Sequence, residues 1–439
     1  MHRGHGDKPK RIIGVFPVAF SLVAAIFGKL GDYSLLYYLE LTLFIASILI
    51  LKFRSGINWI GVSVLTFSPC FFHSMLFPDY AITFFLTTLL VSFYDKPSSS
   101  MFYNIVIGFF SGIVIFFRPE NIFLPFFLGF FQLFTFFVGR TSFKKQYEKD
   151  RFFLIVSSGV AVIIFAVVNY YLYDSIFGSR IGGNAKSLLT QEGNKTFSLL
   201  FFGNGRIGFL TFVPWIILAF LLLTLKFRSL ETKEKILLGS SFASLLAVVI
   251  TAPNDSNIDW GTRYLSWLIV PISLLCFSGN SMKILQSFGL KIRITAFTLF
   301  GISILISFGY LFIQNQISKE FLKYNTWLKS QKTEISIVQQ AKIESLYGQE
   351  ILHRKVLFPN RKSDPKKFAT FITSKASRID LVRYEPSTLA LLESQGGPAG
   401  ESDYVAGADY RLENEFISLG WKQISKQTLG RIEIITLSR

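Results

Sequence analysis

The sequence predicts an all-α polytopic membrane protein with about ten transmembrane helices, an N-terminal surface helix and a small C-terminal α/β soluble domain. Of its 439 residues, 51% are hydrophobic and only 17% are charged, whereas soluble domains carry about 25% charged residues. Its 49 phenylalanines exceed what a few globular cores could bury. Apolar runs recur at about 20 residues, the length that a helix needs to cross a membrane. The same composition excludes disordered, collagenous and disulfide-rich proteins.

The apolar runs divide the chain into a membrane domain, residues 1–313, and a soluble domain, residues 314–439. Residues 12–28 predict a helix at the membrane surface, because Pro17 and Gly28 leave about ten residues, or roughly 15 Å, between them. A proline-kinked span or an uncleaved signal-like segment are the alternatives. The ten spans within 33–313 are expected at 33–51, 57–76, 80–94, 102–117, 121–138, 152–173, 207–225, 236–251, 265–277 and 294–313.

The net charge of +17 is explained by membrane orientation. One set of loops holds about fifteen basic residues against five acidic ones, and the alternate loops are balanced. The positive-inside rule therefore places the basic loops in the cytoplasm and the C-terminal domain outside it. We expect a multi-pass protein of the bacterial cytoplasmic (inner) membrane, with the bilayer as a partner and no nucleic acid.

The C-terminal domain, residues 314–439, is expected to be a small extracytoplasmic α/β unit. Helices are predicted at 316–329 and 364–374, the second opened by Asp364-Pro365. Strands are predicted at 351–358 and 379–384. A terminal hairpin is predicted from 420–427 and 431–437, which flank Leu429-Gly430.

Charged residues near the predicted outer ends of the spans are the candidates for a functional site. Asp79 follows Pro78, Arg118 and Glu120 flank Pro119, and Glu40 lies within the first predicted span. The loop before the ninth span adds Asp259, Trp260, Arg263 and Tyr264.

Each candidate also has an ordinary structural explanation. Asp79 could favour the start of a helix, and Arg118 and Glu120 could be boundary residues. Glu40 could hydrogen-bond a neighbouring helix, and Asp259 and Arg263 could pair with each other at i,i+4. The shared location on one side of the membrane favours the functional interpretation.

Such a cluster suits transfer from a lipid-linked phosphate donor. A carboxylate such as Asp79 can accept a proton from an attacking hydroxyl. Arg118 and Arg263 can bind the leaving phosphate, while Trp260 and Tyr264 can pack against a sugar or a lipid headgroup. The two cysteines and four histidines show no disulfide framework or metal-ligand spacing. We therefore expect no cofactor, although a divalent metal is compatible with this chemistry.

The membrane part resembles the GT-C superfamily of polytopic glycosyltransferases, and specifically bacterial members similar to protein mannosyltransferases and aminoarabinose transferases. The likeness covers roughly residues 12–313 and rests on four short motifs. They are the surface helix ending at Gly28-Lys29-Leu30-Gly31, the acidic loop Phe77-Pro78-Asp79-Tyr80, the segment Gly108–Glu120 with its Arg118-Pro119 pair, and Trp260-Gly261-Thr262-Arg263-Tyr264 with Pro271 downstream.

The sequence departs from the family at its start. Family members carry a span before the surface helix, and the loop between them holds the Asp or Glu that is regarded as the catalytic base. Here only residues 1–11 precede the surface helix, and Asp7 is their sole carboxylate. The resemblance thus implies a member that lacks the first span and the first-loop carboxylate. Either the start of the sequence has been placed too late, or the gene is truncated, or the chemistry uses Asp79 instead.

The leading expectation is therefore a GT-C-like glycosyltransferase, or a truncated or inactive one. It would move a sugar from a polyprenyl-phosphate donor to a glycan, lipid or protein acceptor on the outer side of the membrane. Arg118, Arg263, Glu120 and Asp259 would contact the phosphate or orient the sugar. A transporter or flippase of lipid-linked sugars is one alternative, and a polysaccharide polymerase or ligase is another; internal repeats or broken helices would favour transport.

Overall fold

The structure is a computed structural model that divides into two compact units, Met1–Gly309 and Tyr310–Arg439. The residues described are 23, 25–27, 29, 30, 35–138, 146–173, 176, 194–203, 206–252, 261–330, 333, 335–339, 355–359, 364–388 and 412–439. The predicted surface helix at 12–28 lies mostly outside this set.

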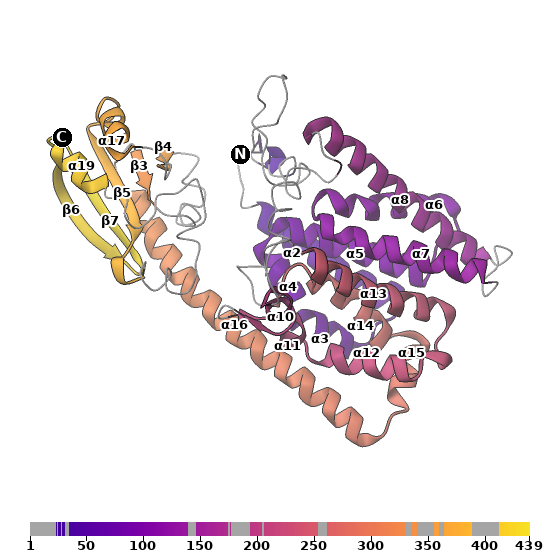
Figure 1. Cartoon of the computed structure of the whole chain (residues 1–439). Coiled ribbons are helices and arrows are strands. Elements are labelled where there is room, and N and C mark those ends of the chain that lie inside the picture. The colour runs from indigo at the N-terminus through magenta and orange to yellow at the C-terminus, as the bar shows by residue number, and fades with distance from the viewer. Residues whose placement is uncertain are drawn as a thin grey trace. The chain divides into compact units, whose positions relative to one another are not determined.

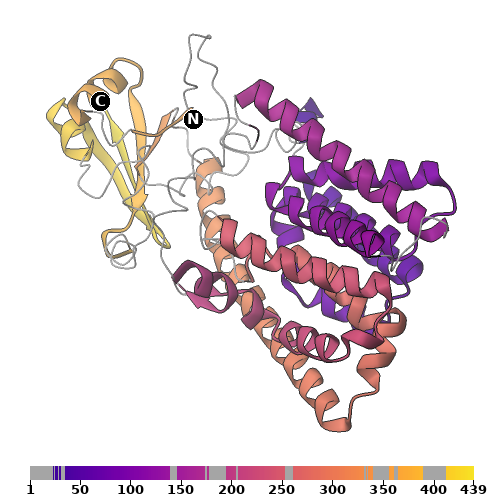
Figure 2. The same ribbon diagram turned by 45° about the vertical axis from the view of Figure 1, so that its right-hand side comes forward.

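The first unit is a bundle of helices, which Figures 1 and 2 show from two directions. Its described residues include one short antiparallel hairpin, in which strand β1 (Phe202–Gly203) pairs with strand β2 (Arg206–Ile207). Its helices are α2 (Leu35–Leu49), α3 (Trp59–Thr66), α4 (Pro69–Leu76), α5 (Pro78–Asp95), α6 (Met101–Gly112), α7 (Phe123–Phe137), α8 (Gln146–Tyr173), α10 (Asn194–Leu200), α11 (Phe209–Phe212), α12 (Trp215–Leu225), α13 (Thr232–Thr251), α14 (Ile269–Phe277), α15 (Gly279–Gln286) and the first part of α16 (Leu290–Ser330).

Among the described residues, five helices are long and apolar enough to cross a membrane, or seven if each of two bent pairs forms one span. The segments Met101–Phe116 and Trp215–Leu225 are apolar but shorter. The sequence predicted about ten spans. Part of the difference arises because apolar composition does not reveal where a helix bends or ends early. In addition, α5, the predicted span at 80–94, is 18 residues long but is not among the helices apolar enough to cross. The structure supports a multi-pass membrane protein, as the composition predicted.

The first bent pair, α3 and α4, turns by 50° at Phe67-Ser68-Pro69. Proline at the start of α4 has no backbone N–H, so the ladder of helical hydrogen bonds is interrupted there. Hydroxyl groups restore the lost partners: Ser68 donates to the Leu65 carbonyl (2.7 Å) and accepts from the Cys70 amide (3.2 Å). Ser307 of α16 donates to the Phe67 carbonyl at 3.1 Å. The predicted span at 57–76 is therefore two helices joined by a stabilised corner.

Helices α6 and α8 pack closely because two glycines face α8. A Cβ atom at Gly108 would lie 2.1 Å from the Leu154 carbonyl oxygen, and one at Gly112 would lie 2.5 Å from the Ser158 carbonyl oxygen. Small residues allow such close backbone approach between membrane helices.

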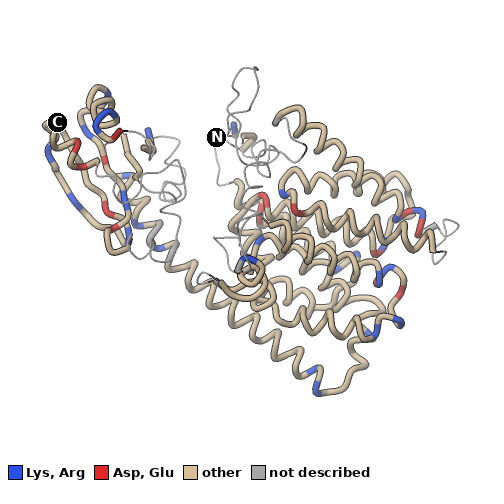
Figure 3. The backbone as a smooth tube through the Cα atoms, in the orientation of Figure 1, with Lys and Arg blue, Asp and Glu red and all other residues tan. Residues whose placement is uncertain are grey.

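Charged residues in the first unit gather at the ends of its helices, as Figure 3 shows. At the ends with the basic loops, Lys233 pairs with Asp95 at 2.7 Å, and Arg151 pairs with Glu148 at 3.0 Å. The long apolar stretches between the ends carry few charges. This separation is what a membrane-spanning bundle requires.

The second unit contains a mixed five-stranded sheet of order β4-β3-β5-β7-β6. Its strands are β3 (Ile335–Val338), β4 (Lys355–Leu357), β5 (Arg378–Tyr384), β6 (Lys422–Leu429) and β7 (Ile432–Ser438). Strand β3 pairs in parallel with β4 and β5, whereas β7 is antiparallel to β5 and β6. The terminal hairpin and the strand at 379–384 are confirmed. Strand β3 was not predicted, because four residues give too short a pattern.

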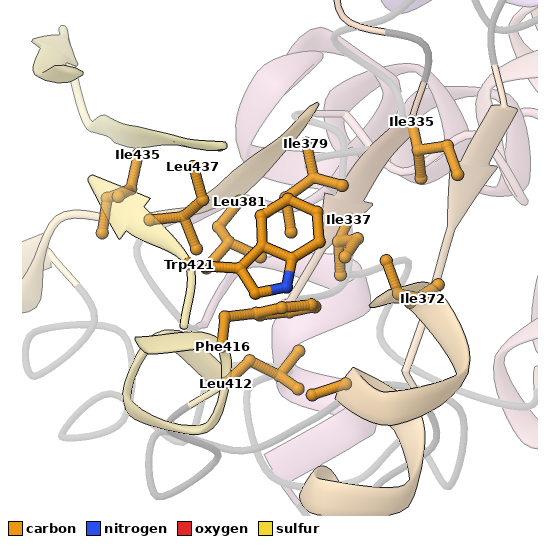
Figure 4. Close-up of a cluster of buried hydrophobic side chains, with 11 residues drawn as sticks. Ile335, Ile337, Ile372, Ile379, Leu381, Leu412, Phe416, Trp421, Ile435 and Leu437 are labelled. Atoms are coloured by element: carbon orange, nitrogen blue, oxygen red, sulfur yellow. The ribbon is translucent and has the colours of Figure 1, made fainter. Parts of the chain in front are cut away.

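Alternate side chains of the sheet form two cores. Ile337, Leu381 and Leu437 pack with Trp421 and Phe416 against α17 (Pro365–Thr373) and α19 (Leu412–Ser418) (Figure 4). On the opposite face, Val338, Val382 and Ile434 pack against Tyr324 and Trp327 of α16. The predicted helix at 364–374 is confirmed as α17. The predicted last span and the predicted helix at 316–329 are one continuous helix, α16, because no glycine or proline separates them after Gly309.

Candidate functional site

Three of the candidate residues form one ion-pair cluster, which we call the Arg118 cluster: Asp79, Arg118 and Glu120. The guanidinium of Arg118 lies 2.9 Å from the Asp79 carboxylate through Nη2 and 3.1 Å from the Glu120 carboxylate through Nη1. Arg118 is 1% exposed, whereas the side chains of Asp79 and Glu120 are 23% and 12% exposed. The cluster therefore has a buried cation and two carboxylates that reach the surface.

Local backbone structure positions each member of the cluster. Pro78 begins α5, so Asp79 lies in the first helical turn, where a carboxylate is favoured. Arg118 has an extended backbone and separates two short 3-10 turns, Ile113–Phe116 and Pro119–Ile122. Pro119 favours this break, because the residue before a proline avoids the helical conformation.

The electrostatics of the cluster favour a permanently charged arginine. Burial alone lowers the pKa of Arg118, but Asp79 and Glu120 raise it by more, so its pKa lies above its ordinary value. Both terminal nitrogens of Arg118 contact carboxylates, while its Nε has no hydrogen-bond partner among the described residues. The ring of Tyr80 lies beneath the guanidinium, with 5.7 Å from Cζ to the ring centroid. Arg118 is thus suited to hold two carboxylates in place.

Arg263 and Tyr264 lie near the same helix start. The Arg263 guanidinium is 5.2 Å from the ring centroid of Phe77, two residues before Asp79. Tyr264 is 2% exposed and interacts electrostatically with Arg118. These residues follow a left-handed turn at Gly261 (φ 78°) and Thr262 (φ 54°).

That turn requires glycine at position 261. A Cβ atom there would lie 2.3 Å from Cγ of Pro69. The close approach brings the chain before Arg263 against the start of α4, and Thr262 fixes it by donating to the Leu199 carbonyl at 2.9 Å.

Glu40 is buried in α2, with 2% of its surface exposed, and its Oε2 has no hydrogen-bond partner among the described residues. It is close enough to Asp79 for the two carboxyl groups to interact electrostatically. Its helix packs on α4 and α5 through Phe44, whose ring is 5.2 Å from that of Phe71 and 5.4 Å from that of Phe84. Glu40 therefore lies inside the bundle on the side of Asp79.

A buried polar group beside the cluster was missed from the sequence. Nδ1 of His73 lies 2.8 Å from Oγ of Ser266, and the Cys70 thiol donates to the Ser266 carbonyl at 3.1 Å. The hydroxyl of Tyr80 donates to the Cys70 sulfur at 3.7 Å, and its ring contacts that of His73. A histidine inside an apolar run was the available signal. This group connects α4, α5 and the segment after Arg263.

Asp259 and Trp260, two further candidates, lie outside the described residues. Of the eight candidates, the structure thus brings Asp79, Arg118 and Glu120 into direct contact, and it brings Arg263, Tyr264 and Glu40 into their vicinity. In the described part of the chain, no group of three or more His, Cys, Asp or Glu residues could hold a metal ion.

No protein-family model matches the chain, and no curated protein is significantly similar to it. The segments around Asp79 and Arg118 meet in the Arg118 cluster.

Proposed function

We propose that the protein is a membrane glycosyltransferase that moves a sugar from a polyprenyl-phosphate donor to an acceptor hydroxyl. This reaction would take place at the outer face of a bacterial cytoplasmic membrane, on the side opposite the basic loops. The observation that carries it is the Arg118 cluster. A buried arginine holds two partly exposed carboxylates where α5 and the turns on either side of Arg118 meet.

Asp79 is the proposed general base. Its carboxylate is the more exposed of the two, and Arg118 holds it in a fixed direction at 2.9 Å. It would accept the proton of the acceptor hydroxyl while that oxygen attacks the anomeric carbon. The bond from the anomeric carbon to the phosphate oxygen then breaks, and the polyprenyl phosphate leaves with the bonding electrons.

Arg263 is the proposed contact for the leaving phosphate. Both terminal nitrogens of Arg118 already contact carboxylates, so we assign Arg118 to positioning. Arg263 is partly exposed and lies over Phe77, close to the start of α5. A guanidinium at this place would stabilise the negative charge that develops on the phosphate.

The test is transfer of labelled sugar from a polyprenyl-phosphate donor by the purified full chain in detergent. We expect Asp79→Asn to lower the turnover by about 100-fold to 10,000-fold, which is the usual contribution of a general base. The matched control is Asp95→Asn, which changes the other aspartate of α5, where it pairs with Lys233. Equal turnover in both variants and the unaltered chain would refute the role of Asp79.

The second candidate function is transport of lipid-linked sugars, and two observations favour it. Two bent helix pairs, with angles of 50° and 67°, resemble the broken helices of transporters. Glu40 is a buried carboxyl within a candidate span, a position typical of transport pathways. In proteoliposomes, lipid-linked sugar that crosses the bilayer without being transferred, and that stops crossing in Glu40→Gln, would favour this candidate.

A further inference from the structure

A cavity of about 430 Å³ lies in the first unit, among helices that do not carry the Arg118 cluster. Residues of α3, α12, α14 and α15 and the first turns of α16 surround it. Its volume lies within the roughly 300–1,000 Å³ that is typical of ligand sites. Its lining includes Trp215, Leu222, Phe277, Met282, Arg293 and Phe297.

The short helix α12 forms one wall of the cavity. Its 11 residues rise about 16 Å, roughly half the thickness of the hydrocarbon core. Trp215 opens this helix and Leu222 lies two turns further on, so the cavity extends about 10 Å along it. The lining residues of the cavity thus follow a helix that points toward the basic loops.

The cavity opens on an apolar surface. Phe297 and Ile60, which belong to the lining, are 60% and 42% exposed, and neighbouring Ile294 is 55% exposed. Phe297 and Ile294 lie in Leu290–Gln316, one of the candidate spans. Such a surface faces lipid chains in a membrane protein. A hydrocarbon chain could therefore enter from the bilayer without crossing water.

One end of the cavity carries positive charge. Arg293 is exposed and belongs to the lining, and Lys283 and Lys291 lie on the adjoining parts of α15 and α16. No acidic residue occurs between Gly279 and Gln316 in the sequence. Within the described residues, none of the three cations has an ion pair. Basic pockets between membrane helices on the cytoplasmic side bind anionic lipid headgroups.

We propose that this cavity binds an anionic phospholipid of the surrounding bilayer, with one acyl chain along α12 and the phosphate on Arg293. The apolar lining and exposed opening select a lipid chain, and the cations, which form no ion pair within the described residues, select an anionic headgroup. The site is independent of the proposed transferase reaction, because it shares no described residue with the Arg118 cluster.

The test uses Trp215 as a reporter within the full chain in lipid nanodiscs. Phosphatidylglycerol with brominated acyl chains is titrated into phosphatidylcholine discs, and brominated phosphatidylcholine is titrated separately. Quenching that is lost in Trp215→Phe is the signal from the cavity. We expect half-maximal quenching at about fivefold less phosphatidylglycerol than phosphatidylcholine.

Two variants, one of them with a matched control, distinguish recognition of the lipid headgroup from recognition of the acyl chain. Arg293→Gln should bring the ratio between the two lipids close to one, whereas Arg228→Gln, which removes an exposed charge outside the lining, should leave it near five. Ala296→Phe, which fills the cavity from α16, should reduce the Trp215 signal for both lipids. A ratio near one in the unaltered chain, or a ratio unchanged by Arg293→Gln, would overturn the proposal.

Discussion

Replacement of Arg118 by methionine tests whether the Arg118 cluster is a true buried charge network. Removing one partner of a buried ion pair costs about 3–5 kcal/mol, because the remaining charge is stranded. Here two carboxylates would be stranded, but both are partly exposed, at 23% and 12%. Water can therefore solvate them in part, and we expect Arg118→Met to lower the free energy of unfolding by about 3 kcal/mol.

The assay is unfolding of the full chain in mixed micelles, titrated with a denaturing detergent and followed by circular dichroism. Arg228→Met is the control for loss of a basic residue at an exposed position. Adding Asp79→Asn and Glu120→Gln to Arg118→Met removes the stranded charges, so this triple variant should lie within about 1 kcal/mol of the unaltered chain. The reasoning is refuted if Arg118→Met destabilises no more than Arg228→Met, or if the triple variant recovers nothing.

Three further predictions concern packing, pH and capping. Gly108→Ala should destabilise the chain by about 1–3 kcal/mol in the same micelle assay, because its Cβ would meet the Leu154 carbonyl, whereas Gly159→Ala, with open space around it, should not. Burial of Glu433 raises its pKa, but hydrogen bonds from Lys426 and Arg383 lower it by more. Because the pKa of Glu433 is lower in the folded state, its ionised form stabilises the folded state at pH values above the unfolded-state pKa. This stabilisation is lost as the pH falls through the folded-state pKa. The urea midpoint of the second unit in the full chain should therefore fall from pH 7 to pH 3, and less steeply in Glu433→Gln; equal slopes would contradict this. Asp364→Ala should cost about 1 kcal/mol in the same urea assay by removing the N-cap of α17, and an unchanged midpoint would show that the cap contributes nothing.

Composition and the recurrence of apolar runs were sufficient to predict a multi-pass bundle and a terminal α/β unit. They could not predict how many spans the apolar runs form. The corner at Ser68-Pro69 and the 11-residue α12 depend on local hydrogen bonds and on packing partners that are distant in sequence. Strand β3 could not be predicted for a related reason, because its four residues form a strand only through their pairing with β4 and β5.

The contacts of Asp79 could be anticipated only in part. The alternation of loops predicted that Asp79, Arg118 and Glu120 lie on one side of the membrane, which is a necessary condition for contact. The sequence could not show that Arg118 contacts both carboxylates, and its extended backbone before Pro119 made this possible. His73 and Ser266 are 193 positions apart, so their contact was not visible from spacing.

The corner between α3 and α4 bears on the choice between the two candidate functions. A helix bend that moves during function must exchange one set of hydrogen-bond partners for another at little cost in free energy. At this corner the Leu65 and Phe67 carbonyls already accept from serine hydroxyls, one of them on α16. Straightening the segment inside a bilayer would leave those oxygens without water to replace the hydroxyls. These hydrogen bonds therefore hold the bend in one conformation. Such a bend suits a rigid scaffold for catalysis better than a helix that must straighten during each transport cycle.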